Sequence, residues 1–338
     1  MYQEAALEEW RNLYEAAEKI KEKKPWDQFW DMDLIGIQEG KEEDTVFFSI
    51  LGKGGSCYGI SMYQGYSGLN DFMLLTMQEE LNVSTEYAMF SQNTLTCYWG
   101  NREELSSRQR QIIKELGYKY RGKNQWLYFM SYSKGYYPYN LDKEETERLT
   151  KYLRLLAEAL DYYQEHEMNV EFESGHMFLY AYDKENGKWQ GSSQPLPFTM
   201  YSFPNLMLED DELRSELRRA EKNKMILEAD IAYMGVGMRG EKGDRPKNPE
   251  MVMIADSQTG MILRAEMTEQ GEDEKISLAQ EIVDFILNCG APKEIRISNL
   301  IIEAVLEDIC AEAGIHLRRV KRLKELDEFW QALRERGL

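Results

Sequence analysis

One carboxylate within an apolar stretch is the first residue of this sequence that could carry chemistry. Asp230 lies in the run ILEADIAY, whose other positions are mostly those of a strand. A carboxylate held on a strand can bind a divalent cation, and we take Asp230 as a candidate metal ligand. Both aspartates of this region also have a plausible structural role. Asp230 could accept hydrogen bonds from backbone amides at a strand end, and Asp256 could organise the turn that follows its own strand.

A basic run near the end of the chain is the second candidate. Within 316–324 it holds Arg318, Arg319, Lys321 and Arg322, which form a possible patch for an anion or an acidic partner. Alternating basic residues on an edge strand also prevent edge-to-edge pairing, and this second interpretation is favoured.

Other patterns point away from familiar sites. The three histidines and four cysteines lack metal-ligand or CxxC spacing. The turn GKGG at 52–55 is followed by a strand-like run, so it predicts a hairpin rather than a phosphate loop, which must lead into a helix. A tyrosine-rich, locally basic stretch at 118–141 could stack nucleic-acid bases, but an aromatic strand is favoured in so acidic a protein.

The elements that would position Asp230 follow from the pattern of the last third of the chain. Strands are expected around Asp230 and at 251–255, 261–267, 293–298 and 315–320. Helices are expected at 278–289, 301–313 and 326–336. Gly260 predicts a tight turn between the second and third strands, and Ser277 is the expected N-cap of the first helix.

With these residues in place, the segment 226–338 resembles the retroviral-integrase and transposase branch of the ribonuclease-H-like superfamily. EADIAYMG resembles the strand that carries the family's first catalytic aspartate, matched here by Asp230. PKEIRISN, followed by a helix and AGIHL, resembles the segment of the second aspartate, where this sequence has Ser298 and Asn299. The family's third carboxylate lies on a late helix, where Asp327 or Glu328 could serve.

The resemblance implies a catalytically degenerate domain, because two-metal phosphoryl transfer needs clustered carboxylates and neither serine nor asparagine supplies that charge. Asn299 could still bind one Mg²⁺ through its carbonyl oxygen, with the lower affinity of a neutral ligand. The alternative is a nuclease or phosphoryl-transfer enzyme that depends on Mg²⁺ or Mn²⁺ and uses Asp230, Asn299 and Asp327 or Glu328. Otherwise no cofactor is expected.

The N-terminal part carries strong local signals of an α+β unit. Asp142 and Glu145 have the spacing of a capping box at the start of a long amphipathic helix, and Asn186-Gly187 predicts a hairpin turn. The stretches LGKGGSCYGISMYQGYSGLN, YYPYNLDKEETERL and MIADSQTGMILRAEM make the whole chain similar to uncharacterised bacterial proteins of two domains. We therefore expect an α+β domain at 1–205, a helical linker at 206–225 and, at 226–338, an α/β ribonuclease-H-like domain with a mixed five-stranded sheet.

Composition sets the remaining expectations. The 338 residues are 43% hydrophobic and 30% charged, and no apolar run is long enough for a membrane span. The N-terminus lacks the pattern of a secretory signal, which favours the cytoplasm. A net charge of −19 opposes nucleic-acid binding. The sequence thus predicts a non-catalytic binding or assembly protein with a protein partner, and a nucleic-acid-binding module is a further alternative. It does not predict the oligomeric state.

Overall fold

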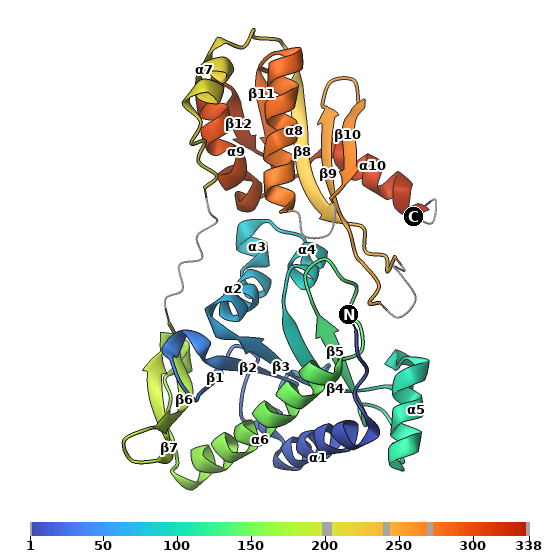
Figure 1. Cartoon of the computed structure of the whole chain (residues 1–338), viewed down its shortest axis with the longest axis vertical. Helices are drawn as coiled ribbons and strands as arrows, with labels where there is room; N and C mark the ends of the chain where they lie inside the picture. The colour runs from blue at the N-terminus through green and yellow to red at the C-terminus, as the bar shows by residue number, and fades with distance from the viewer. Residues whose placement is uncertain (1, 198–204, 239–243, 269–272, 336–338) are drawn as a thin grey trace.

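The strands of the protein form two mixed sheets, one in each half of the chain (Figure 1). The structure is a computed structural model that describes residues 2–197, 205–238, 244–268 and 273–335. In this part of the chain the sheets have seven and five strands. The chain is therefore a mixed α/β protein in two parts, as the strand and helix patterns predicted.

The seven-stranded sheet has the order β5-β4-β3-β2-β1-β6-β7, with β1 parallel to β6 and all other neighbours antiparallel. Helices α1, α5 and α6 pack on one face through a large apolar cluster. The strands are β1 Ile35–Gln38, β2 Val46–Leu51, β3 Tyr58–Gln64, β4 Thr94–Gly100, β5 Trp126–Tyr132, β6 His176–Asp183 and β7 Lys188–Pro195. The three helices are α1 Leu7–Lys23, α5 Ser107–Leu116 and α6 Lys143–Glu165. Short 3-10 helices are η1 Pro25–Asp27, η2 Glu42–Asp44, η3 Arg102–Glu104 and η4 Phe172–Ser174.

Several local signals of the N-terminal half are confirmed. Asp142 caps α6 and forms the predicted capping box with Glu145. The GKGG segment joins the antiparallel strands β2 and β3, and Gly55 there has a φ of +78°. Gly187 turns the chain between β6 and β7 with a φ of +64°. These positions need a left-handed backbone that glycine adopts without strain.

Three short helices lie between the two halves and contact both of them. They are α2 Gly65–Thr76, α3 Gln78–Leu81 and α4 Thr85–Phe90, and they lie between the two sheets in Figure 1. The start of α2 packs on the seven-stranded sheet through Leu69 and Phe72. Leu81 and Tyr87 instead belong to the apolar cluster of the five-stranded sheet. The halves therefore share buried surface rather than being joined only by a connecting segment.

The five-stranded sheet has the order β10-β9-β8-β11-β12. β8, β9 and β10 are antiparallel neighbours, whereas β8, β11 and β12 run parallel. Its strands are β8 Ile226–Tyr233, β9 Glu250–Asp256, β10 Ile262–Met267, β11 Glu294–Ile297 and β12 His316–Arg319. The helices are α7 Asp211–Arg219, α8 Glu274–Cys289, α9 Leu300–Glu312 and α10 Lys324–Glu335.

Helices cover both faces of this sheet. α7, α8 and α9 share an apolar cluster on one face, and α10 packs on the other (Figure 1). The predicted turn is confirmed, with Gly260 at a φ of +71°. The expected N-cap at Ser277 is wrong, because α8 begins four residues earlier and Asp273 accepts the backbone N–H of Lys275 at 2.9 Å.

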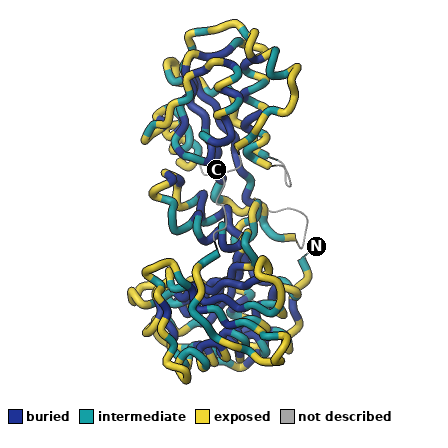
Figure 2. Tube along the Cα trace, turned by 90° about the vertical axis from the view of Figure 1, so that its left-hand side faces the viewer, coloured by how far each residue is buried: buried dark blue, intermediate teal, exposed yellow. Residues whose placement is uncertain are grey.

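Burial follows the two sheets, whose strands are mostly buried and whose outer helical faces are exposed (Figure 2). The segment expected to link two domains contains α7, which packs on α8 and α9. Arg214 of α7 pairs with Asp308 of α9 at 2.9 Å. Among the described helices, none is long and apolar enough to cross a membrane.

Candidate functional site

Strand β8 places two carboxylates on one face. Glu228 and Asp230 are two residues apart, so both point to the same side of the sheet. The intervening Ala229 and its alternate neighbours Leu227 and Ile231 pack into the cluster beneath α8 and α9. The carboxylate side is therefore the side that α10 covers.

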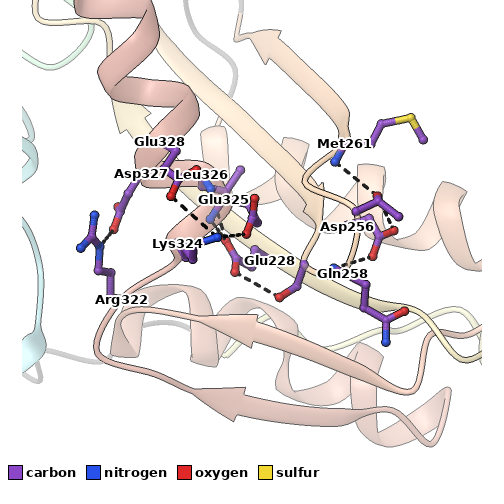
Figure 3. A network of polar contacts seen from close by, with 12 residues as sticks. Glu228, Asp256, Gln258, Met261, Arg322, Lys324, Glu325, Leu326, Asp327 and Glu328 are labelled. Carbon is purple, nitrogen blue, oxygen red and sulfur yellow. Dashed lines mark hydrogen bonds and ion pairs between the residues drawn. The ribbon is translucent and has the colours of Figure 1, made fainter.

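Glu228 holds α10 in place. Its side chain is 2% exposed, and its Oε2 accepts the backbone N–H groups of Glu325 at 2.9 Å and Leu326 at 3.2 Å (Figure 3). The hydroxyl of Ser257 donates to Oε1 at 3.3 Å. A carboxylate at a helix N-terminus satisfies amides without helical partners and opposes the positive end of the helix dipole. Glu228 thus positions the helix that carries Asp327, a role that the sequence analysis missed.

A cavity of about 620 Å³ opens beside Asp230. Its lining from the C-terminal half includes Asp230, Ser298, Asn299 and Asp327. These residues come from β8, from the segment after β11 and from α10. The structure therefore brings together the predicted candidates except Glu328.

The carboxyl group of Asp230 is a weaker acid in this cavity than in water. Burial raises the pKa of its carboxyl from 3.8 to about 7, and the negative charge of Asp327 adds to this effect. Hydrogen bonds from the Ile231 N–H, at 3.0 Å, and from Ser298 act in the opposite direction. Because the loss of hydration dominates, Asp230 takes up and releases a proton near neutral pH.

Asn299 serves mainly as a helix cap. Its Oδ1 accepts the backbone N–H of Ile302 at 3.0 Å, and its Nδ2 donates to the Ser298 hydroxyl at 3.2 Å. The residue is 8% exposed. The oxygen that would bind Mg²⁺ under the nuclease alternative is therefore already engaged at the start of α9.

Asp327 and Glu328 are neighbours on α10 but point in different directions, since successive helical residues are about 100° apart. Asp327 lines the cavity and its Oδ2 accepts from Arg322 Nε at 2.8 Å. Glu328 lies outside the cavity lining, 3.7 Å from Lys324 Nζ (Figure 3). Asp327 is thus the member of the pair that belongs to the site.

The donor set does not fit a two-metal centre. Across the described segments, no three His, Cys, Asp or Glu residues are grouped so that they could hold a metal ion. Asp327 is already paired with Arg322, and Asn299 offers a neutral oxygen that caps a helix. Two cations held about 4 Å apart need more carboxylate charge than Asp230 and Asp327 provide.

The far wall of the cavity comes from the N-terminal half. Asn82, which follows α3 with a φ of +53°, donates from Nδ2 to the backbone carbonyl of Ser298 at 2.6 Å. Glu86 of α4 forms an ion pair with Arg334 of α10. These contacts place α3 and α4 beside the cavity that Asp230 and Asp327 line.

The predicted basic patch is largely paired with acidic side chains. Arg319 lies 3.1 Å from Glu303, and Arg318 lies 3.9 Å from Glu294. Lys321 and Arg322 belong to the cavity lining. β12 is an edge strand, which agrees with the interpretation that its charges protect an exposed edge.

Comparison with known proteins finds one family model in each half of the chain. A protein-family model described as "Domain of unknown function (DUF7309)" matches residues 10–180, just over half of the 338 residues. The chain belongs to this family. A second model, described as "Domain of unknown function (DUF6930)", matches residues 213–334. No curated protein matches the sequence.

Proposed function

We propose that this protein is a non-catalytic binding protein whose C-terminal part, residues 226–338, is a degenerate ribonuclease-H-like domain. The strand order β10-β9-β8-β11-β12, with antiparallel strands on one side of β8 and parallel strands on the other, supports the fold. Asp230 on the central strand, Ser298 after β11 and Asp327 on the last helix support the resemblance at the level of the site. The proposal includes an α+β domain at 1–205 and a location in the cytoplasm.

One observation carries the proposal: this chain has no carboxylate at the position where ribonuclease-H-like enzymes have their second catalytic aspartate. Ser298 and Asn299 stand there, and the Asn299 oxygen caps α9. Without that charge, the site keeps two of the three carboxylates that the resemblance implies, Asp230 and Asp327, and Asp327 is paired with Arg322. A cavity of this kind is suited to binding a ligand or a partner's side chain through hydrogen bonds rather than to metal-assisted hydrolysis.

The wall that α3 and α4 form limits the size of the cavity, which favours a small ligand or a protein segment as the occupant. α3 and α4 lie across the cavity through Asn82 and Glu86, which leaves about 620 Å³ beside Asp230. Nucleic acid is a poor partner for a chain with a net charge of −19 whose basic patch is engaged by its own carboxylates. We therefore favour a protein or small-molecule partner.

A metal-dependent nuclease is the competing function, and one observation favours it. Asp230 and Asp327 line the same cavity, and the raised pKa of Asp230 is what a neighbouring cation would lower. The test is calorimetry with Mg²⁺ and with Mn²⁺ on the wild type and Asp230→Ala, together with a nuclease assay on the same samples. Glu328→Ala is the matched control, because it removes an adjacent carboxylate outside the cavity.

The binding proposal expects no cleavage and no uptake of metal that depends on Asp230. Cleavage that disappears in Asp230→Ala but persists in Glu328→Ala would overturn it in favour of the nuclease. Asn299 would then be the next residue to replace.

A further inference from the structure

A second cavity, of about 570 Å³, lies in the N-terminal half where β3 and β5 end. Its lining includes the β3–α2 junction at Gln64–Gly68, Ser133 after β5, and Arg148 of α6. Among the described residues, none lines both this cavity and the one beside Asp230. It is thus a separate place at which a ligand could bind.

Arg148 is the unusual residue of this cavity. Its Nε is fully buried without an acceptor, and its guanidinium makes no hydrogen bond or ion pair with any residue that the structure describes. An arginine stays charged at every physiological pH, and leaving buried donors without acceptors is costly. A partly buried guanidinium of this kind is suited to binding an anion from outside the chain.

The acidic residue of the same helix that lines this cavity, Glu145, cannot supply that anion. Glu145 lies three residues before Arg148 and lines the same cavity. Its Oε1 accepts from the Ser131 hydroxyl at 2.8 Å, and its Oε2 accepts from the Asp142 N–H at 2.9 Å and from Arg245. Both oxygens are engaged, so Glu145 is neutralised by Arg245 rather than by Arg148.

The opposite wall offers backbone donors. β3 passes directly into α2, and within the described part of the chain no side chain caps this helix at Gln64. The N–H groups of its first turn, on Tyr66 and Ser67, therefore lack a capping acceptor beside the cavity, at the positive end of a 12-residue helix. Gly65 has a φ of +66°, and a Cβ at Gly68 would lie 2.9 Å from the Tyr63 carbonyl carbon. Glycines at both positions allow this tight strand-to-helix turn.

We propose that this cavity binds the phosphate group of a small phosphorylated molecule. The Arg148 guanidinium supplies a planar pair of donors, and the first turn of α2 supplies backbone N–H groups, the combination that suits a phosphate. Glu43 and Asp44 are exposed residues of the same lining, and Glu43 lies 3.6 Å from Lys41. Their carboxylates disfavour an extended polyanion and select a ligand with one phosphate group.

The test is titration calorimetry at constant ionic strength on the full chain. The probes are inorganic phosphate, glycerol 3-phosphate as a phosphomonoester, and acetate as a carboxylate. We expect both phosphates to bind the wild type, and Arg148→Met to bind them at least about tenfold more weakly, since one charge-assisted pair is lost. Arg154→Met is the matched control, because it removes the same charge from an exposed position of the same helix outside the cavity, and it should bind like the wild type.

Two further measurements separate a loss of phosphate binding from a loss of folding or of charge. The thermal midpoint of each variant without phosphate shows whether it folds, and Arg148→Lys, which keeps the charge but loses the planar fork, should also bind more weakly. Tighter binding of glycerol 3-phosphate than of inorganic phosphate would identify a phosphomonoester as the natural class, and the reverse order would identify free phosphate. Equal phosphate affinity in wild type and Arg148→Met, or binding of acetate alone, would overturn the proposal.

Discussion

At the scale of single residues, Asp230 is the side chain whose environment most changes its chemistry. Its neighbour on the same strand face, Glu228, is more deeply buried but accepts two helix amides, whereas Asp230 has fewer donors and faces the charge of Asp327. Hydrogen bonds from N–H groups compensate a buried carboxylate, and lost hydration without such bonds favours its protonated form. Two carboxylates of one strand therefore have different roles: Glu228 caps a helix, whereas Asp230 lines a cavity.

The raised pKa of Asp230 predicts a pH-dependent stability. Because the folded-state pKa, about 7, exceeds the ordinary value of 3.8, the folded state binds the proton more tightly. The contribution of the protonated group is complete below about pH 4 and is lost as the pH rises to about 7. Asp230→Asn should be more stable than the wild type at pH 8, by roughly 1–3 kcal/mol, and should differ little at pH 4.

Thermal and urea unfolding between pH 4 and pH 8 measures this difference. Asp284→Asn, at an exposed position of α8, is the control and should follow the wild-type profile. If Asp230→Asn and the wild type have parallel profiles, the pKa of Asp230 is not raised.

At the scale of elements, α10 depends on a cap supplied from a distant strand. Glu228 is 97 residues before Glu325 in the chain, yet it accepts the amides of the first turn of α10. Since α10 brings Asp327 to the cavity, the position of Asp327 depends on the cap that Glu228 supplies. Replacing the cap should therefore alter the site without touching it.

Glu228→Gln should destabilise the protein by about 1–3 kcal/mol, because the amide loses the charge that opposes the helix dipole and places an N–H₂ group near the helix donors. Hydrogen exchange should accelerate at the amides of Glu325 and Leu326. Glu325→Gln is the control, since it changes a carboxylate of the same turn that accepts no helix amide. Exchange in Glu228→Gln at the wild-type rate would show that α10 does not need this cap.

At the scale of the whole molecule, the two halves are held together by contacts that are far apart in sequence. Arg245, between β8 and β9, donates to the Ser131 hydroxyl at 2.9 Å and to Asp142 at 3.0 Å, and it pairs with Glu145. Only 12% of its side chain is exposed. Together with the shared cluster around Leu81 and Tyr87, this ion pair joins the two halves.

Arg245→Met should lower the free energy of unfolding by about 3–5 kcal/mol, because it leaves Glu145 buried without its cation. Denaturant unfolding measures the loss, and small-angle scattering should show a larger radius of gyration if the halves separate. Arg264→Met, which removes an exposed pair with Glu281 inside the C-terminal half, should change neither quantity appreciably. A loss in Arg245→Met no greater than in Arg264→Met would mean that Arg245 does not hold the halves together.

The sequence by itself determined the elements and the positions where they turn. The Asp142 cap, the Gly187 and Gly260 turns and the apolar run around Asp230 depend on residues within a few positions of one another, so they can be predicted locally. The same local reasoning placed the cap of α8 at Ser277 rather than at Asp273, because both are good capping residues and the pattern alone does not rank them.

Only the tertiary structure decided how the site is assembled. The choice of Asp327 over Glu328 depends on how α10 is rotated on the sheet, and the role of Glu228 depends on a helix 97 residues away. The wall from Asn82 to Glu86 depends on packing between the halves. Such contacts arise from the burial of apolar surface between distant segments, whose relative position no short stretch of sequence encodes.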